Sequence, residues 1–194
     1  MESSDWLDTI CAKASHVNSD TLKEVITLGV ELAREGREGR KVGTIFTVGD
    51  AAEVLTQSRS LILDPVKGHP PAMRRIEDMN VRETIKELSQ LDGAFVISDD
   101  GVLISAARYL NSSWEDLDLP LGLGSRHMAG ASISKRTSAV AVVVSESSVV
   151  RIFVDGELVT EILPELWMMD RFHSSIASPE SIGDDHVAVL SQRE

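Results

Sequence analysis

The sequence lacks features that mark several protein classes. Its 194 residues include one cysteine, Cys11, so no disulfide can form within the chain and a cytoplasmic location is expected. The only apolar run of note, from Ala139 to Val144, is far shorter than the ~20 residues of a membrane helix. The acidic start of the chain also lacks the basic-then-apolar pattern of a signal peptide. We therefore expect a soluble protein without a membrane partner.

Basic charge and aromatic side chains are also scarce. The 31 acidic residues outnumber the 19 basic ones and give a net charge of −12. Nucleic-acid-binding proteins carry basic surfaces and stack bases on aromatic rings, whereas this chain has four phenylalanines and one tyrosine. A nucleic-acid partner is therefore disfavoured, although one small anion in a locally basic pocket remains compatible with the composition.

Several common catalytic motifs are absent. The chain has no P-loop GxxxxGK[ST], no HExxH, no paired CxxC and no GxSxG. The pair Gly122 and Gly124 lacks the third glycine of a dinucleotide-binding fingerprint. The length fits one main domain, and we expect an arm or short helix over 1–18, this main domain over 19–175 and a tail over 176–194.

The order of helices and strands predicts an α/β fold. Thr21 and Glu24 have the spacing of a capping box, which predicts a helix from Thr21 to about Arg37. Further helices are expected over 51–58, 80–90 and 128–135, and from Pro164 to about 175. Strands are expected over 42–48, 61–63, 94–98, 102–107, 139–144, 149–154 and 157–162. Because tight Asp-Gly turns join several strands, we predict a mixed sheet covered by helices.

The segment Asp92-Gly93-Ala94 stands directly before a predicted strand. Asp-Gly is a common turn dipeptide, so taken alone the segment is typical of a helix-to-strand turn. The functional interpretation is a carboxylate beside a glycine that lets a ligand approach the backbone. The same dipeptide at 100–101 and 155–156 lies inside predicted hairpins and indicates plain turns.

A glycine-rich segment, LGLGSRHMAGAS over 121–132, enters a predicted helix. Free N–H groups and the positive end of the helix dipole favour an anion there. Arg126 can grip a phosphate with two hydrogen bonds, and His127 can ligate a metal or donate to a phosphate. The alternative is a capped helix with a surface Arg-His pair. Ser145-Glu146, after the predicted strand over 139–144, is by itself typical of a polar turn.

Taken together, these segments resemble the catalytic domain of the diadenylate cyclase family, which joins two ATP molecules into cyclic di-AMP. Asp92-Gly93-Ala94 matches the family's Asp-Gly-Ala motif, and Arg126-His127-Met128 matches two of three positions of its Arg-His-Arg motif. The similarity covers roughly residues 20–165, in the segments GREGRKVGTIFTVGD, LILDPVKGH, LDGAFVISDDGVLISAARYL, LGLGSRHMAGASISKRTSAVAVVVSES and RIFVDGEL. The likeness is closest to the soluble archaeal-type branch, whose members often carry an N-terminal domain for which this chain is too short.

The resemblance implies a globular domain with a central mixed sheet of about seven strands flanked by helices. It implies that Asp92 lies near the ribose 3′-hydroxyl and a metal ion, Mn²⁺ or Mg²⁺. Arg126 and His127 are the further catalytic residues that it implies, with His127 a second metal ligand. The residues expected to bind ATP are Gly93, Leu110, Gly124, Ser125, Arg126, His127, Met128, Ala129, Ser145 and Glu146.

Met128 departs from the family pattern, because many relatives have a second arginine there. One phosphate-facing cation is lost, and Arg108, Lys135 and Arg136 are the nearby candidates to replace it. This departure supports the alternative function, a non-catalytic adenine-nucleotide-binding regulatory module. For the cyclase, each chain offers one ATP site, so we expect two chains to meet face to face about a twofold axis.

Overall fold

The computed structural model describes residues 5–113, 117, 120 and 122–167, which contain both helices and strands. The helices are α1 (Asp5–Lys13), α2 (Ser19–Glu35), α3 (Ala51–Thr56), the 3-10 helix η1 (Pro71–Met73), α4 (Met79–Leu88) and α5 (Ser125–Arg136). The strands are β1 (Thr44–Val48), β2 (Ser58–Ser60), β3 (Ala94–Ile97), β4 (Leu103–Leu110), β5 (Val140–Val144), β6 (Val150–Val154) and β7 (Glu157–Ile162).

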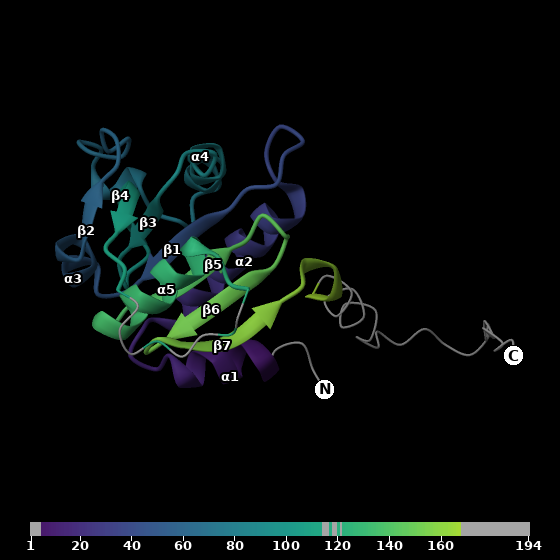
Figure 1. Cartoon of the computed structure of the whole chain (residues 1–194). Helices are drawn as coiled ribbons and strands as arrows, with labels where there is room; N and C mark the ends of the chain where they lie inside the picture. Colours follow the sequence, from purple (N-terminus) through teal and green to yellow (C-terminus); the bar gives the residue numbers. More distant parts are fainter. Residues whose placement is uncertain (1–4, 114–116, 118–119, 121, 168–194) are drawn as a thin grey trace, which may run out of the picture.

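One mixed sheet forms the centre of the protein. Its seven strands lie in the order β2-β4-β3-β1-β5-β6-β7, and helices cover both faces (Figure 1). Strands β1 and β3 pair in parallel, and the other neighbouring pairs are antiparallel. The predicted α/β class, with a mixed sheet of about seven strands between helices, is therefore confirmed. None of the helices in the described part of the chain is long and apolar enough to traverse a bilayer.

Helix α2 covers one face of the sheet. Asn18 caps it, because its side-chain oxygen accepts hydrogen bonds from the backbone N–H groups of the second and third residues of the helix region, each at 3.0 Å. The predicted capping box is wrong. The Thr21 hydroxyl donates to the carbonyl of Asp99, and Glu24 pairs with Arg82 at 2.7 Å. The side chains of Thr21 and Glu24 thus bind groups distant in the sequence instead of the backbone at the start of the helix.

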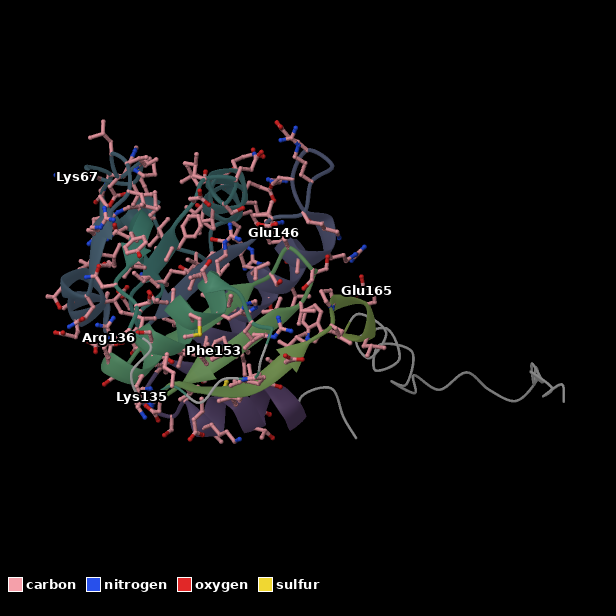
Figure 2. All side chains as sticks on the ribbon, in the orientation of Figure 1. Lys67, Lys135, Arg136, Glu146, Phe153 and Glu165 are labelled. Atoms are coloured by element: carbon pink, nitrogen blue, oxygen red, sulfur yellow. The ribbon has the colours of Figure 1, made fainter. Side chains whose placement is uncertain are left out.

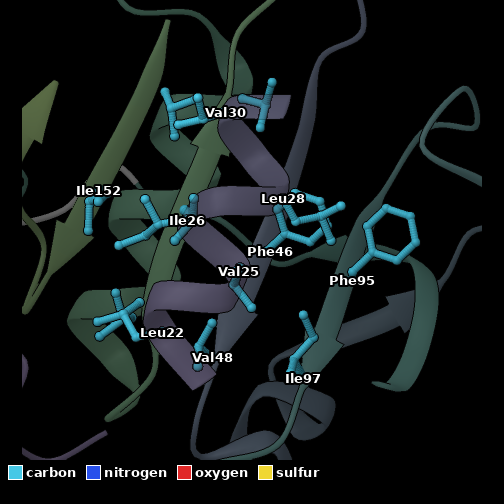
Figure 3. Close-up of a cluster of buried hydrophobic side chains, with 14 of the residues drawn as sticks. Leu22, Val25, Ile26, Leu28, Val30, Phe46, Val48, Phe95, Ile97 and Ile152 are labelled. Carbon is cyan, nitrogen blue, oxygen red and sulfur yellow. The ribbon is translucent and has the colours of Figure 1, made fainter. Parts of the chain in front are cut away.

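Apolar side chains at helical spacing hold α2 against the strands. Leu22 and Ile26 are completely buried beside β5 and β6, in the same core cluster as Phe46 of β1 (Figure 3). Phe46 also stacks on Phe95 of the parallel strand β3, with ring centroids 5.2 Å apart. Each such buried side chain stabilises the fold by roughly 1.5–3 kcal/mol. This packing fixes β1 beside β3.

Helix α4 is held to α2 by buried charges. Arg82 and Lys86 are only 5% and 7% exposed, and each lies 3.0 Å from the carboxylate of Glu31. Arg82 also pairs with Glu24, and Lys86 with Glu83, so more than one carboxylate compensates each buried cation. The network therefore fixes α4, whose end leads directly into the predicted Asp-Gly-Ala segment.

Helix α5 packs on the opposite face at unusually short range. A Cβ atom at Gly130 would lie 2.5 Å from Cγ2 of Val143, so only glycine allows this approach. Alternation along β5 sends Ala141 and Val143 toward α5, and Val142 and Val144 toward α2. The strand over 139–144 is thus buried on both faces, as its uninterrupted apolar run predicts.

Two predicted elements differ from the structure. The strand expected over 61–63 is absent, and Leu63 is 94% exposed. The strand β2 lies just before it, where backbone pairing with β4 selects Ser58–Ser60 despite its polar sequence. The helix expected from Pro164 to about 175 is seen over 164–167, and its remainder and the tail over 176–194 lie outside the described residues.

Gly29 of α2 and Gly130 of α5 pack against opposite faces of β5, and we expect substitution by alanine to have opposite effects on stability at the two positions. Gly130→Ala forces α5 away from β5, and we expect a loss of unfolding free energy of about 1–3 kcal/mol. Gly29→Ala in α2 meets only ordinary contacts, the nearest 3.4 Å away, and replaces a poor helix former. It should be neutral or stabilise by up to about 1 kcal/mol. Urea unfolding of both variants measures the difference, and equal effects would contradict the packing.

Candidate active site

Segments far apart in the sequence meet at one end of the sheet. Because β1 and β3 are parallel and β5 is antiparallel to β1, the starts of β1 and β3 lie beside the end of β5. Gly43 precedes β1, Asp92 lies two residues before β3, and Glu146 follows β5. Helix α5 begins at this same end with Ser125, and the next residue, Arg126, contacts Asp92 and Glu146. We call this place the site end of the sheet.

The guanidinium of Arg126 joins these segments. Its Nη1 donates to Oε1 of Glu146 at 2.8 Å, and its Nη2 lies 3.4 Å from Oδ1 of Asp92. The side chains of Asp92 and Glu146 are 87% and 63% exposed, so water screens both contacts. Gly43 makes room for this arrangement, since a Cβ there would lie 2.9 Å from Nη1. Arg126 is therefore positioned, yet free to exchange these weak contacts for a ligand.

The first turn of α5 has no side-chain cap. Gly124 stands at the cap position, and its carbonyl accepts from the N–H groups of His127 and Met128 at 3.0 and 3.2 Å. The N–H groups and positive dipole end of such a terminus favour a negatively charged group. The helix thus begins without a side-chain cap, and an anion at its N-terminus stays a prediction.

An apolar cleft of about 370 Å³ opens on one side of Arg126. It lies between the end of β4, the start of β3 and the first turns of α5, and apolar surface makes up most of its wall. The predicted site residues that line it are Asp92, Gly93, Leu110, Ser125, Arg126 and Ala129. Ile45, Leu61, Ala94, Arg108, Tyr109 and Ser112 complete the wall. This shape and size suit a flat heterocycle with a sugar.

A polar cavity of about 390 Å³ opens on the other side, and we call it the cradle. Its walls are the entry to α5 and the turn after β5. The predicted residues that line it are Gly124, Ser125, Arg126, His127, Ser145 and Glu146, and Gly122, Leu123, Ser147 and Arg151 complete it. Ser125 and Arg126 line both the cleft and the cradle, so the two cavities adjoin.

His127 is buried at the back of the cradle. Its Nε2 lies 2.9 Å from Nη1 of Arg151, and because a guanidinium only donates, Nε2 accepts this hydrogen bond. Burial of the ring, and next the charge of Arg151, lower the pKa of His127 below its ordinary value. The imidazole is therefore neutral at pH 7 and its Nε2 lone pair points at Arg151.

The two predicted metal ligands occupy different cavities. Asp92 lines the cleft and His127 the cradle. Within the described residues, no group of three or more His, Cys, Asp or Glu side chains is arranged to hold a metal ion. The exposed carboxylate of Asp92 nevertheless suits Mg²⁺ or Mn²⁺, which proteins commonly bind through one or two carboxylates together with substrate phosphates. The donor set at Asp92 thus fits a metal that arrives with a nucleotide.

The candidates to replace the cation absent at position 128 do not reach the cradle. Met128 itself is buried and lines neither cavity. The guanidinium of Arg108 is hydrogen-bonded to the end of α3 and to β2, at Leu55, Ser58 and Ser60. Lys135 and Arg136 lie at the opposite end of α5, well away from Glu146 (Figure 2).

Among the residues of this site that were missed in the sequence, Gly43 and Arg151 differ in the signal that they give. Gly43 gives no local signal, because its role depends on where Arg126 folds back. Arg151 does give one, since it is a charged residue inside the apolar run Val149 to Val154, which otherwise predicts a buried strand. A cation in such a strand needs a polar partner or cavity, and here it meets both His127 and the cradle.

The fold and its adjoining cavities define the protein as an α/β domain with the cradle beside an apolar cleft. Residues 31–158 match the model of the DAC family, described as DisA bacterial checkpoint controller nucleotide-binding. The chain belongs to this family. A protein named diadenylate cyclase from Methanocaldococcus jannaschii is 53% identical over 145 residues, which are 74% of this chain and 46% of that protein. Another of that name, from Haloferax volcanii, is 44% identical over 155 residues, 79% of this chain and 56% of that protein.

The chain thus spans about half the length of the curated relatives it matches. Solved structures support the fold at lower identity. A crystal structure of a double mutant of DacA from Staphylococcus aureus matches with a TM-score of 0.53 at 19% identity, covering 80% of this chain and 94% of that one. A hypothetical membrane spanning protein from Bacillus cereus gives a TM-score of 0.57 at 19% identity, covering 77% and 67%.

Gly93 predicts a strong structural requirement inside the site. Its φ is +113°, and a Cβ would lie 2.7 Å from the backbone carbon of Ala107, where β4 bulges. We expect Gly93→Ala to lower the free energy of unfolding by about 2–4 kcal/mol. Gly124→Ala is the matched control, because no atom lies within 4 Å of its Cβ position, and it should cost about 1 kcal/mol or less. Chemical denaturation measures both, and a stable Gly93→Ala variant would contradict the backbone approach.

Proposed function

We propose that the chain is a diadenylate cyclase, which condenses two ATP molecules into cyclic di-AMP and releases two pyrophosphates. The observation that carries this proposal is the position of Arg126, which contacts Asp92 and Glu146 where the apolar cleft and the cradle adjoin. The apolar cleft suits a nucleoside, and the cradle suits a triphosphate. Membership of the DAC family and the names of the two relatives support the same reaction.

The proposal extends one ATP across the cleft and the cradle. The adenine lies in the cleft against Leu110 and Ala129, where apolar walls exclude water. The ribose lies toward Gly93, whose lack of a side chain lets it approach, and its 3′-hydroxyl lies near Asp92. The triphosphate extends past Arg126 into the cradle, where the N–H groups at the start of α5 and Ser125, Ser145 and His127 surround it.

The reaction forms one bond and breaks one bond at each α-phosphorus. The ribose 3′-oxygen of one ATP attacks the α-phosphorus of the other, the bond to the pyrophosphate oxygen breaks, and the 3′-hydroxyl proton is lost. Asp92 orients this hydroxyl and favours loss of its proton. Arg126 stabilises the charge that develops on the phosphate oxygens. His127, whose neutral ring is held in place by Arg151, forms part of the wall around the triphosphate.

A divalent cation completes the proposed site. Asp92 would hold Mn²⁺ or Mg²⁺ together with phosphate oxygens of ATP. Nε2 of His127 is not free to be a second ligand, because it accepts a hydrogen bond from Arg151. When bound, the ion neutralises phosphate charge and lowers the pKa of an attacking oxygen.

The product requires two sites that face each other. Each chain carries one cleft and one cradle, so one chain binds one ATP and cannot close the ring. Two chains related by a twofold axis at their site ends would aim each 3′-oxygen at the opposite α-phosphorus. The exposed carboxylate of Asp92 lies at this surface.

The activity is tested with ATP and Mn²⁺ or Mg²⁺, with mass spectrometry to detect cyclic di-AMP. We expect product from the wild-type chain, and at least a ~100-fold lower rate from Asp92→Asn with ATP binding largely kept. Asp155→Asn is the matched control, because it changes the Asp of an Asp-Gly turn between β6 and β7 and should leave the rate unchanged. Full turnover by Asp92→Asn would remove this carboxylate from the mechanism, and binding without any product at high protein concentration would favour the non-catalytic module.

The need for two chains predicts a steep dependence on protein concentration. Below the dimer dissociation constant, the rate per chain should fall in proportion to concentration, because only paired chains turn over. A dilution series with the oligomeric state measured by mass photometry or sedimentation tests this. A rate strictly proportional to enzyme among proven monomers would rule out the facing arrangement.

A further inference from the structure

The cradle contains a cation that comes from the sheet rather than from α5. Arg151 lies on β6, its side chain is 15% exposed, and it lines the cradle together with Arg126 and the turn after β5. Its neighbours along the strand, Val150 and Ile152, are completely buried in the core. A guanidinium at this position is costly to bury unless it serves a polar partner.

Two contacts fix the direction of this guanidinium. Its Nε donates to Oε1 of Glu161 on the neighbouring strand β7 at 2.5 Å, and its Nη1 donates to Nε2 of His127 at 2.9 Å. Glu161 is half exposed, so it neutralises the charge only partly. The Glu161 contact holds the planar group at its Nε end, and its Nη end lies against His127, which also lines the cradle.

The rest of the cradle is short of positive charge. Along α5, Arg126 is the charged residue that lines the cradle, and Glu146 opposes it with a negative charge at 2.8 Å. Position 128 holds a buried methionine. A nucleoside triphosphate brings about four negative charges, and fixed donors of opposite charge stabilise them best.

We propose that Arg151 is a phosphate-binding residue of the cradle, which supplies from β6 the second cation that α5 lacks. This inference rests on the proposed function for its substrate, a nucleoside triphosphate, and assigns to Arg151 the end of the phosphate chain that lies deepest. Through its hydrogen bond it also fixes the ring of His127, whose Nε2 accepts from Arg151.

The test separates phosphate binding from nucleoside binding. Inorganic triphosphate probes the cradle and adenosine probes the cleft, and calorimetry in the same magnesium buffer measures both without turnover. We expect Arg151→Gln to weaken inorganic triphosphate by 10–100-fold, the usual effect of losing charge-assisted hydrogen bonds, with adenosine affinity within about twofold of wild type. Arg151→Lys, which keeps the charge, should recover most of the lost affinity.

Controls keep the result interpretable. Arg75→Gln removes a guanidinium that is also paired with a glutamate, Glu77, but lies outside both cavities, and it should bind both probes as wild type does. If Arg151→Gln does not fold, Arg151→Met retains the unbranched stem and carries the same comparison. Equal triphosphate affinity in wild type and the folded charge-removing variant, or equal weakening of triphosphate and adenosine, would overturn the assignment.

The experiment also distinguishes a wrong assignment of Arg151 from a wrong assignment of the cyclase activity. A wild-type chain that binds inorganic triphosphate and loses this binding in Arg151→Gln supports the inference even if no cyclic di-AMP forms. In the cyclase assay, the same variant should raise the KM for ATP more than it lowers kcat if Arg151 binds substrate phosphates. A wild-type chain that makes cyclic di-AMP with an Arg151→Gln variant of unchanged KM would leave the cyclase intact and reject the role of Arg151.

Discussion

The parallel pairing of β1 with β3 is the constraint on which the site depends. It brings the chain before β1 and the chain before β3 to the same end of the sheet, and the antiparallel strand β5 returns its own end there. Reversing any one of these directions would carry Asp92 or Glu146 to the far end of the molecule. The stacked rings of Phe46 and Phe95 and the buried charges between α2 and α4 hold this pairing in place. The catalytic chemistry that we propose therefore depends on the directions of these strands.

The same constraint explains what the sequence could predict. Apolar and β-branched runs identified the long strands, because burial on both faces leaves a strong local signal. The strand over 61–63 was wrong for the converse reason: β2 is selected by backbone pairing with β4, and its polar residues Ser58–Ser60 carry no such signal. The capping box at Thr21 failed because a distant carbonyl took its hydroxyl. Local sequence patterns therefore predict an element well where burial in the core determines it. They predict it poorly where pairing with another strand or a contact with a distant turn determines it.

The candidate site follows the same division. Asp92, Ser125 and Arg126 could be proposed because two motifs stand at the ends of predicted elements, and the structure brings them to adjoining cavities. Gly43 could not be found, since its role appears only when a side chain from position 126 lies over it. The roles assigned to these residues in ATP binding and catalysis stay predictions. Arg151 shows that a charge interrupting an apolar strand is a signal worth following.

The two outer strands of the sheet have a consequence for how copies of the chain can associate. At one side β2 is only three residues long, and at the other β7 carries glutamates at 157 and 161. Short or charged borders are poor templates for adding a strand from a neighbouring molecule. The sheet thus discourages the open-ended addition of strands at either border, and the facing pair of chains that we propose would leave both borders out of its contacts.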